Sequence, residues 1–66
     1  MFKTIVVACS IAAPDACWHF IDTRGPYDSQ QQCRTRAYAM SNQIRQIHRD
    51  LEPKAFRCEF LKGRSL

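Results

Sequence analysis

Four cysteines are the residues of this sequence with the most evident chemistry. They follow the spacing Cys-x7-Cys-x15-Cys-x24-Cys in a chain of 66 residues. A core of this size is marginal without crosslinks, so an even number of cysteines predicts two disulfides and an extracellular, periplasmic or virion location. The alternative is four reduced cysteines buried as small apolar residues. The spacing contains no Cys-x2-Cys pair, which argues against a zinc site and against a thiol redox motif.

Two histidines, His19 and His48, are the other side chains suited to acid–base chemistry. No Ser-His-Asp order, glycine-rich phosphate loop or metal-binding histidine pair accompanies them in the sequence. Asp22 and Asp28 lie on either side of the sequence Arg-Gly-Pro-Tyr and are interpreted as turn residues. The sequence therefore predicts that the protein is not an enzyme, with no catalytic residue, no cofactor and no metal.

A basic row with one aromatic residue is the feature most compatible with nucleic acid. On a helix, Arg34, Tyr38, Arg45 and Arg49 share one exposed side, where Asn42 also lies. Such a row suits contacts with a phosphate backbone, although an ordinary solvated helix face has the same composition. The net charge of +4 allows a nucleic acid, an anionic lipid or an acidic protein as partner. Weak nucleic-acid binding is therefore the alternative function.

The elements that would position these side chains are one helix and three strands. Apolar residues at alternating steps of four and three predict a helix over about residues 29–51. Asp28 or Ser29 would cap its start, and Pro53 would set its end. The apolar row that this helix would bury consists of Cys33, Ala37, Met40, Ile44, Ile47 and Leu51.

Three apolar stretches, at about residues 2–9, 17–23 and 55–61, predict strands. The first is apolar on both faces, as is typical of a central strand; it also resembles a signal peptide but is too short for one. A hairpin of the first two strands and a right-handed crossover through the helix give a three-stranded sheet of order 2-1-3. The chain is thus predicted to be one α+β domain, residues 1–66, of order β-β-α-β, with the helix on one face. A frayed tail is expected at residues 63–66, and no segment is long enough to span a bilayer.

This layout distinguishes among the possible disulfide pairings. Cys9 and Cys17 would lie at the same end of the hairpin, whereas Cys33 would lie near the other end, on the buried row of the helix. Cys58 would point toward that helix. Because the Cα atoms of a disulfide lie about 4.4–6.8 Å apart, the preferred pairs are Cys9–Cys17 and Cys33–Cys58. The alternative is Cys9–Cys58 with Cys17–Cys33, if the first and third strands pair near those residues.

The aromatic residues of the second strand define the candidate partner-binding surface. Strand alternation sends Trp18 and Phe20 to one face and their neighbours to the other. On the face without a helix they would lie near Phe2 and Val6, and these four residues would bind a protein partner or a second copy. On the face under the helix they would simply be core. Both arrangements are compatible with the sequence.

The cysteines have particular neighbours, which are Ala8-Cys9, Ala13-Pro14, Cys17, Cys33 and Phe56-Arg57-Cys58. This arrangement resembles small uncharacterised four-cysteine proteins of marine bacteria and their phages. The resemblance implies a bacterial or phage origin and carries over no activity and no site residue. The function expected from the sequence is a non-enzymatic structural or protein-interaction module, such as a minor component of a phage particle or an exported binding protein.

Overall fold

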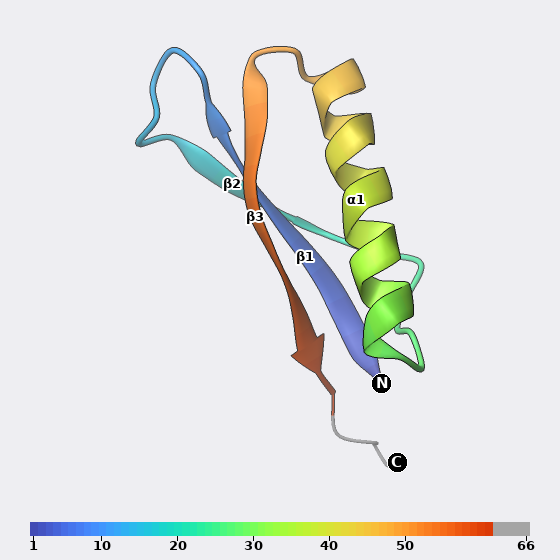
Figure 1. Cartoon of the computed structure of the whole chain (residues 1–66). Coiled ribbons are helices and arrows are strands. Elements are labelled where there is room, and N and C mark those ends of the chain that lie inside the picture. The colour runs from blue at the N-terminus through green and yellow to red at the C-terminus, as the bar shows by residue number, and fades with distance from the viewer. Residues whose placement is uncertain (62–66) are drawn as a thin grey trace.

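The computed structural model of the chain describes residues 1–61, and the tail expected at residues 63–66 lies outside them. Its elements are β1 (Phe2–Ser10), β2 (Cys17–Ile21), α1 (Gln30–Ile47) and β3 (Leu51–Phe60). The strands form one sheet of order β2-β1-β3, with α1 packed along one side of it (Figure 1). The predicted α+β fold and its strand order are confirmed.

The central strand β1 pairs with both of its neighbours in antiparallel register. Its residues are buried on both faces: Thr4, Val6 and Ala8 have no exposed surface, and Ile5 and Cys9 are 5% and 6% exposed. The sequence of β1 is apolar over a continuous run because this strand is paired along both edges and its residues are buried on both faces.

Helix α1 packs on β1 and β3, and within residues 1–61 it does not extend over β2. Its buried side chains are Cys33, Ala37, Met40 and Ile44. Four of the predicted six are therefore core residues in the helix. Val6, Ala8 and Leu51 complete the core cluster from the strands, and Phe20 and Phe56 pack against it. One side of β2 is left without a covering element.

The helix is shorter than the sequence predicts. It begins at the predicted cap Ser29, whose hydroxyl accepts a hydrogen bond of 3.1 Å from the Gln32 N–H. It ends at Ile47 and not near residue 51, because Leu51 reaches the core from the start of β3. Ile47 is 73% exposed, so its assignment to the buried row is wrong.

Pro53 does not stop the helix; it lies inside β3, which begins four residues earlier than predicted. An edge strand accepts proline where the missing N–H removes no ladder bond, and bulges are common there. The β1–β3 register shifts between Val7 and Ala8, next to Pro53. Strand β2 in turn ends at Ile21 and not at residue 23, because the Asp22 side chain bonds to the turn that follows.

The disulfides pair Cys9 with Cys17 and Cys33 with Cys58, the two pairs that the layout favours. Cys9 and Cys17 are directly opposite on β1 and β2, with Cα atoms 3.9 Å apart. The hairpin loop beyond them, residues 11–16, is mostly exposed and closes with a 2.8 Å bond from Ser10 N–H to the Ala16 carbonyl.

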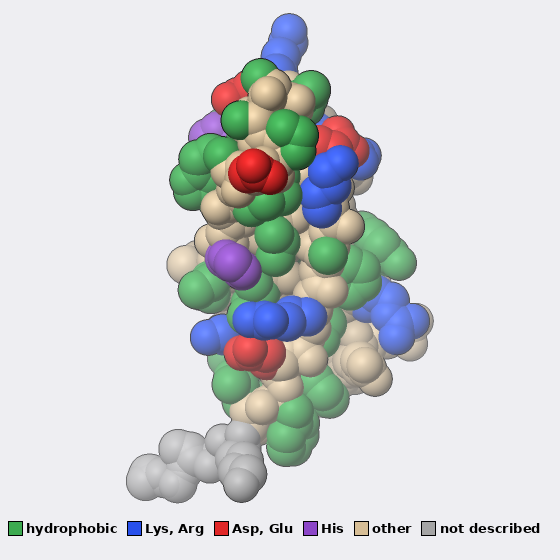
Figure 2. All heavy atoms as spheres, turned by 90° about the vertical axis from the view of Figure 1, so that its left-hand side faces the viewer, with side chains coloured by type: hydrophobic (Ala, Val, Ile, Leu, Met, Phe, Trp, Pro, Cys, Tyr) green, Lys and Arg blue, Asp and Glu red, His purple; other side chains and the backbone are tan. Residues whose placement is uncertain are grey.

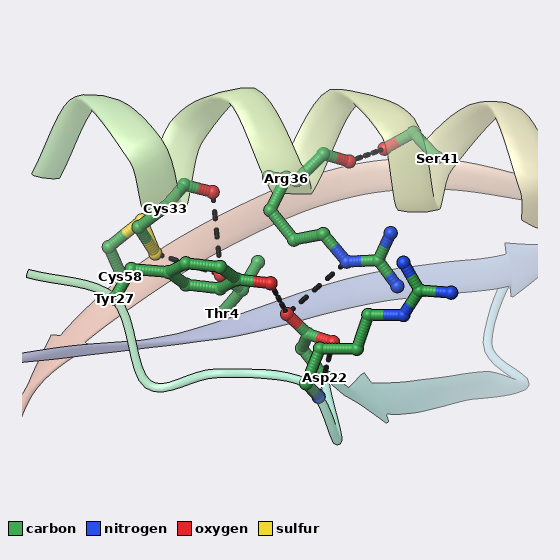
Figure 3. Close-up of polar contacts among 9 residues, drawn as sticks. Thr4, Asp22, Tyr27, Cys33, Arg36, Ser41 and Cys58 are labelled. Atoms are coloured by element: carbon green, nitrogen blue, oxygen red, sulfur yellow. Dashed lines mark hydrogen bonds and ion pairs between the residues drawn. A yellow bond between two sulfur atoms is a disulfide. The ribbon is translucent and has the colours of Figure 1, made fainter.

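The second disulfide joins the first turns of α1 to β3, with Cα atoms 6.1 Å apart. The buried hydroxyl of Thr4 on β1 lies 2.9 Å from Cys33 Sγ and 3.4 Å from the Cys33 carbonyl (Figure 3). A disulfide sulfur carries no proton, so the hydroxyl is the donor in this contact. All three elements around this end of the core are therefore fixed to one another.

Candidate functional site

The aromatic residues of β2 face the helix side of the sheet. Trp18 is directly opposite Ala8, and Phe20 is opposite Val6. Ala8 and Val6 belong to the core beneath α1, and directly opposed residues of an antiparallel pair share a face. Phe2, an even number of residues from Val6 on β1, shares that face too. Of the two arrangements left open by the sequence, the one with these four residues on the uncovered face is therefore wrong, and Val6 is fully buried and unavailable to a partner.

Because α1 does not cover β2, a groove remains between them. One hollow of about 220 Å³ lies between β2 and the second half of α1. A neighbouring hollow of about 350 Å³ shares Phe20 and His48 with it and reaches Trp18 and the start of β3. We call this feature the β2–α1 groove, and the side chains that define it are Trp18, Phe20, Met40, Ile44, Ile47 and His48.

The floor of the groove is core, and its rim combines exposed apolar side chains with polar ones such as Gln43 and Asp50. Met40 and Ile44 are 7% and 5% exposed, whereas Trp18 is 50% and Ile47 is 73% exposed. Phe20 is half-buried between them, and its ring centre lies 5.9 Å from that of His48. Exposed apolar side chains that line a hollow beside a few polar groups are typical of a binding site.

One end of the groove is fixed by a buried carboxylate, Asp22, whose side chain is 1% exposed. The Tyr27 hydroxyl donates to Oδ2 at 2.6 Å, and the Arg24 N–H donates to Oδ1 at 3.0 Å. Arg36 of α1 completes the cluster, with Nε 3.2 Å from Oδ2 (Figure 3). These contacts hold the end of β2, the following turn and the helix together.

The cluster keeps the Asp22 carboxylate charged. Burial raises the pKa of Asp22, but the hydrogen bonds from Tyr27 and Arg24 and the charge of Arg36 lower it by more, so the pKa lies below its ordinary value. The hydrogen bond to Asp22 raises the pKa of Tyr27. The sequence predicts a turn role for Asp22, and its hydrogen bond from the Arg24 N–H agrees with that role. The ion pair of Asp22 with Arg36 has no signal in the sequence.

The predicted basic row lies along the other side of α1, next to β3. Tyr38 is 57% exposed, and its ring meets that of Phe56 edge-on at 5.6 Å. Arg45 is paired with Glu52 at 3.0 Å, which neutralises part of the row. Arg34 lines a shallow hollow with Tyr38. Arg49 lies beyond the end of the helix, whereas Arg34, Tyr38, Asn42 and Arg45 lie within it.

The face of the sheet away from α1 carries both apolar and charged side chains. Figure 2, which views the molecule from that side, shows hydrophobic groups interrupted by basic and acidic ones. On β3, Arg57 lies opposite Ile5 and pairs with Glu59 at 3.4 Å, and Ala55 lies opposite Val7. His19 and Ile21 of β2 are exposed.

Within residues 1–61, no three His, Cys, Asp or Glu side chains lie close enough together to hold a metal ion. The single helix of this part of the chain is too polar to cross a membrane. Comparison with models of protein families, with curated proteins and with solved structures finds no match for this chain. The resemblance to bacterial and phage four-cysteine proteins therefore stays a prediction, and function must be argued from the chain's own surface.

Proposed function

We propose that the protein is a non-enzymatic, disulfide-stabilised module that binds another protein through the β2–α1 groove. The observation that supports this proposal most directly is that exposed apolar side chains line both hollows: Ile47 lies beside the buried Met40 and Ile44 in one, and Trp18 beside the buried Leu51 in the other. A partner that covers them removes apolar surface from water at about 25 cal/mol per Å². A few hundred Å² would outweigh the cost of ordering a few side chains.

The walls of the groove are held in place before a partner arrives. Cys9–Cys17 crosslinks β2 to β1 next to Trp18, and the Asp22–Arg36 ion pair ties the end of β2 to α1. Cys33–Cys58 fixes α1 against β3. Because little of this surface must be ordered on binding, less of the gain from apolar burial is lost.

The two disulfides are compatible with an oxidising location. We propose an extracellular, periplasmic or virion site for the protein, and the roles that suit it are a minor component of a phage particle or an exported binding protein. Both roles require contacts with other proteins, which the groove would supply.

A second candidate function is weak binding of nucleic acid on the β3 side of α1. Arg34 lies beside the half-exposed ring of Tyr38, and Lys54 lines the next hollow along the helix with Tyr38 and Arg45. Such a surface would contact phosphates and stack one base, without reading sequence. The Arg45–Glu52 pair reduces its charge, which is why the groove is the first choice.

The groove is tested by selecting a random peptide library on the oxidised full-length protein. We expect apolar peptides whose binding is lost in the double variant Trp18→Ser, Ile47→Ser. The matched control is Tyr38→Ser, Ile11→Ser, since these side chains are 57% and 63% exposed elsewhere on the surface. Amide exchange checks that both variants stay folded. Peptides that bind both variants equally, or no selected peptide at all, would overturn the proposal.

A further inference from the structure

The two edges of the sheet differ in how they resist pairing with another strand. The β3 edge contains Pro53, Lys54 and a register shift, followed by the charged pair Arg57 and Glu59. Proline, lysine and bulges are the usual protection of an edge strand. The β2 edge has the sequence Cys-Trp-His-Phe-Ile in unbroken register, with no proline and no lysine, arginine, aspartate or glutamate. Of the two edges that residues 1–61 form, the β2 edge is therefore the one without such protection.

The backbone groups at this edge can be assigned from the ladder. Asp22 N–H donates to the Thr4 carbonyl at 3.0 Å, and Ser10 N–H donates to the Ala16 carbonyl at 2.8 Å. In an antiparallel pair the residues that bond to the neighbour alternate with residues whose N–H and C=O point away. The even-numbered residues of β2 therefore bond to β1. Cys17, His19 and Ile21 direct their N–H and C=O groups outward.

We propose that β2 pairs with β2 of a second copy of this chain, antiparallel and about a two-fold axis at His19. The inference rests on the proposed function and names its partner. This register brings all three outward-directed residues into hydrogen-bonded pairs, with His19 opposite His19 and Cys17 opposite Ile21 of the second copy. Registers centred elsewhere leave one of them unpaired.

The same register is complementary in its side chains. Trp18 lies opposite Phe20 of the second copy, in a pair without direct backbone hydrogen bonds, where the Cα atoms approach to about 4.5 Å and side chains are closest. Aromatic pairs across strands are among the more stabilising ones. Trp18 is 50% exposed in the single copy, and in this register Phe20 of the second copy would pack against its ring. No charged side chain of either β2 opposes a like charge.

The assembly closes on itself. Two copies give one sheet of strand order β3-β1-β2-β2-β1-β3, in which each outer edge is a protected β3. An isologous pairing of this kind occupies the unprotected β2 edge of each copy, and the other edge formed by the described residues is β3. The expected species is a dimer with no further growth.

The test is sedimentation equilibrium of the oxidised full-length protein over a range of concentrations. His19→Lys and His19→Glu each place like charges opposite one another and should each raise the dimer Kd about fivefold. An equimolar mixture places lysine opposite glutamate and should restore pairing. Lys54→Glu on the β3 edge is the matched control, with no change expected. His19→Pro removes two hydrogen bonds at the axis and none to β1, and should raise Kd about thirtyfold.

Hydrogen exchange adds a residue-level measurement. The amides of Cys17, His19 and Ile21 should be protected in the dimer and exchange freely in His19→Lys, while the amides bonded to β1 stay protected in both. A wild type that remains monomeric up to its solubility limit overturns the inference, as does a dimer that His19→Pro leaves intact. If peptides still bind the groove of such a monomer, the proposed function stands and only the second copy is wrong. If they do not, both fail.

Discussion

The two long sides of α1 differ in how they contact the sheet. On the β3 side the helix is crosslinked through Cys33–Cys58, and Arg45 pairs with Glu52 across the gap. On the β2 side, no strand of the described part of the chain packs against the helix, and several apolar side chains line the opening. A helix is about 10 Å wide and strands lie about 4.8 Å apart, so α1 packs on two strands and leaves β2, the shortest, uncovered. The apolar side chains on this uncovered side are the ones that a partner could bury.

The largest expected effect concerns the crosslinked side. Replacing Cys33 and Cys58 together by alanine should lower the free energy of unfolding by about 3 kcal/mol, since the disulfide spans 25 residues of sequence. Urea denaturation measures the loss. The matched variant, Cys9→Ala with Cys17→Ala, should lose less, because its separation is 8 residues. Equal losses would show that loop length does not set the difference.

A second prediction compares the stability effects of a half-buried residue and an exposed residue of the β2–α1 groove. Phe20→Thr should lower the free energy of unfolding by about 2 kcal/mol, since Phe20 packs against the core cluster. Trp18→Ser should change it by less than about 1 kcal/mol, because half of that side chain is exposed. Thermal denaturation of the single variants measures both. A larger loss in Trp18→Ser would make Trp18 part of the core and remove the rim of the groove.

The third prediction concerns the carboxylate at the end of the groove. The pKa of Asp22 is lower in the folded chain than in the unfolded one, so its contribution to stability is present above the unfolded pKa and is lost as pH falls through the folded pKa. Asp22→Asn should lower the free energy of unfolding by about 1 kcal/mol at neutral pH. The further decrease of that free energy between neutral and acid pH should be smaller in the variant than in the wild type. Urea denaturation from pH 7 down to pH 2 checks both. Parallel curves for variant and wild type would contradict it.

The smallest effect on stability is expected on the basic row. Replacing Arg34, Arg45 and Arg49 by glutamine should change the free energy of unfolding by less than about 0.5 kcal/mol, because these side chains are exposed. Any binding to single-stranded DNA, measured by fluorescence anisotropy, should be weak, salt-sensitive and lost in this variant. Binding that survives, or that distinguishes sequences, would place the nucleic-acid surface elsewhere.

The sequence predicts the elements well because the core uses simple periodicities. The steps from Cys33 to Ile44 are helical, and the apolar run of β1 marks a central strand. The end of the helix was mispredicted because Leu51 continues the helical spacing across a short turn. Spacing alone cannot tell a residue on the next helical turn from one that enters the same core from a strand.

The site was harder to predict because it depends on which face α1 covers. Alternation separates Trp18 from its neighbours on β2 but assigns neither set to the helix. That choice follows from the register that places Phe56 opposite Val6, and no residue type in the two strands specifies this register. The Asp22–Arg36 ion pair joins residues from separate parts of the chain, so no sequence motif predicts it.

The Cys9–Cys17 crosslink has a consequence for the hairpin loop that it closes. Residues 11–15 are exposed, which makes this loop the natural place for a protease to cut the chain. A cut there leaves Cys9 on one fragment and Cys17 on the other, so the two fragments remain one covalent molecule. The shorter fragment contains all of β1 up to the crosslink and stays hydrogen-bonded between β2 and β3. The cleaved protein should therefore migrate as two fragments only after reduction, and it should stay folded although its backbone is cut.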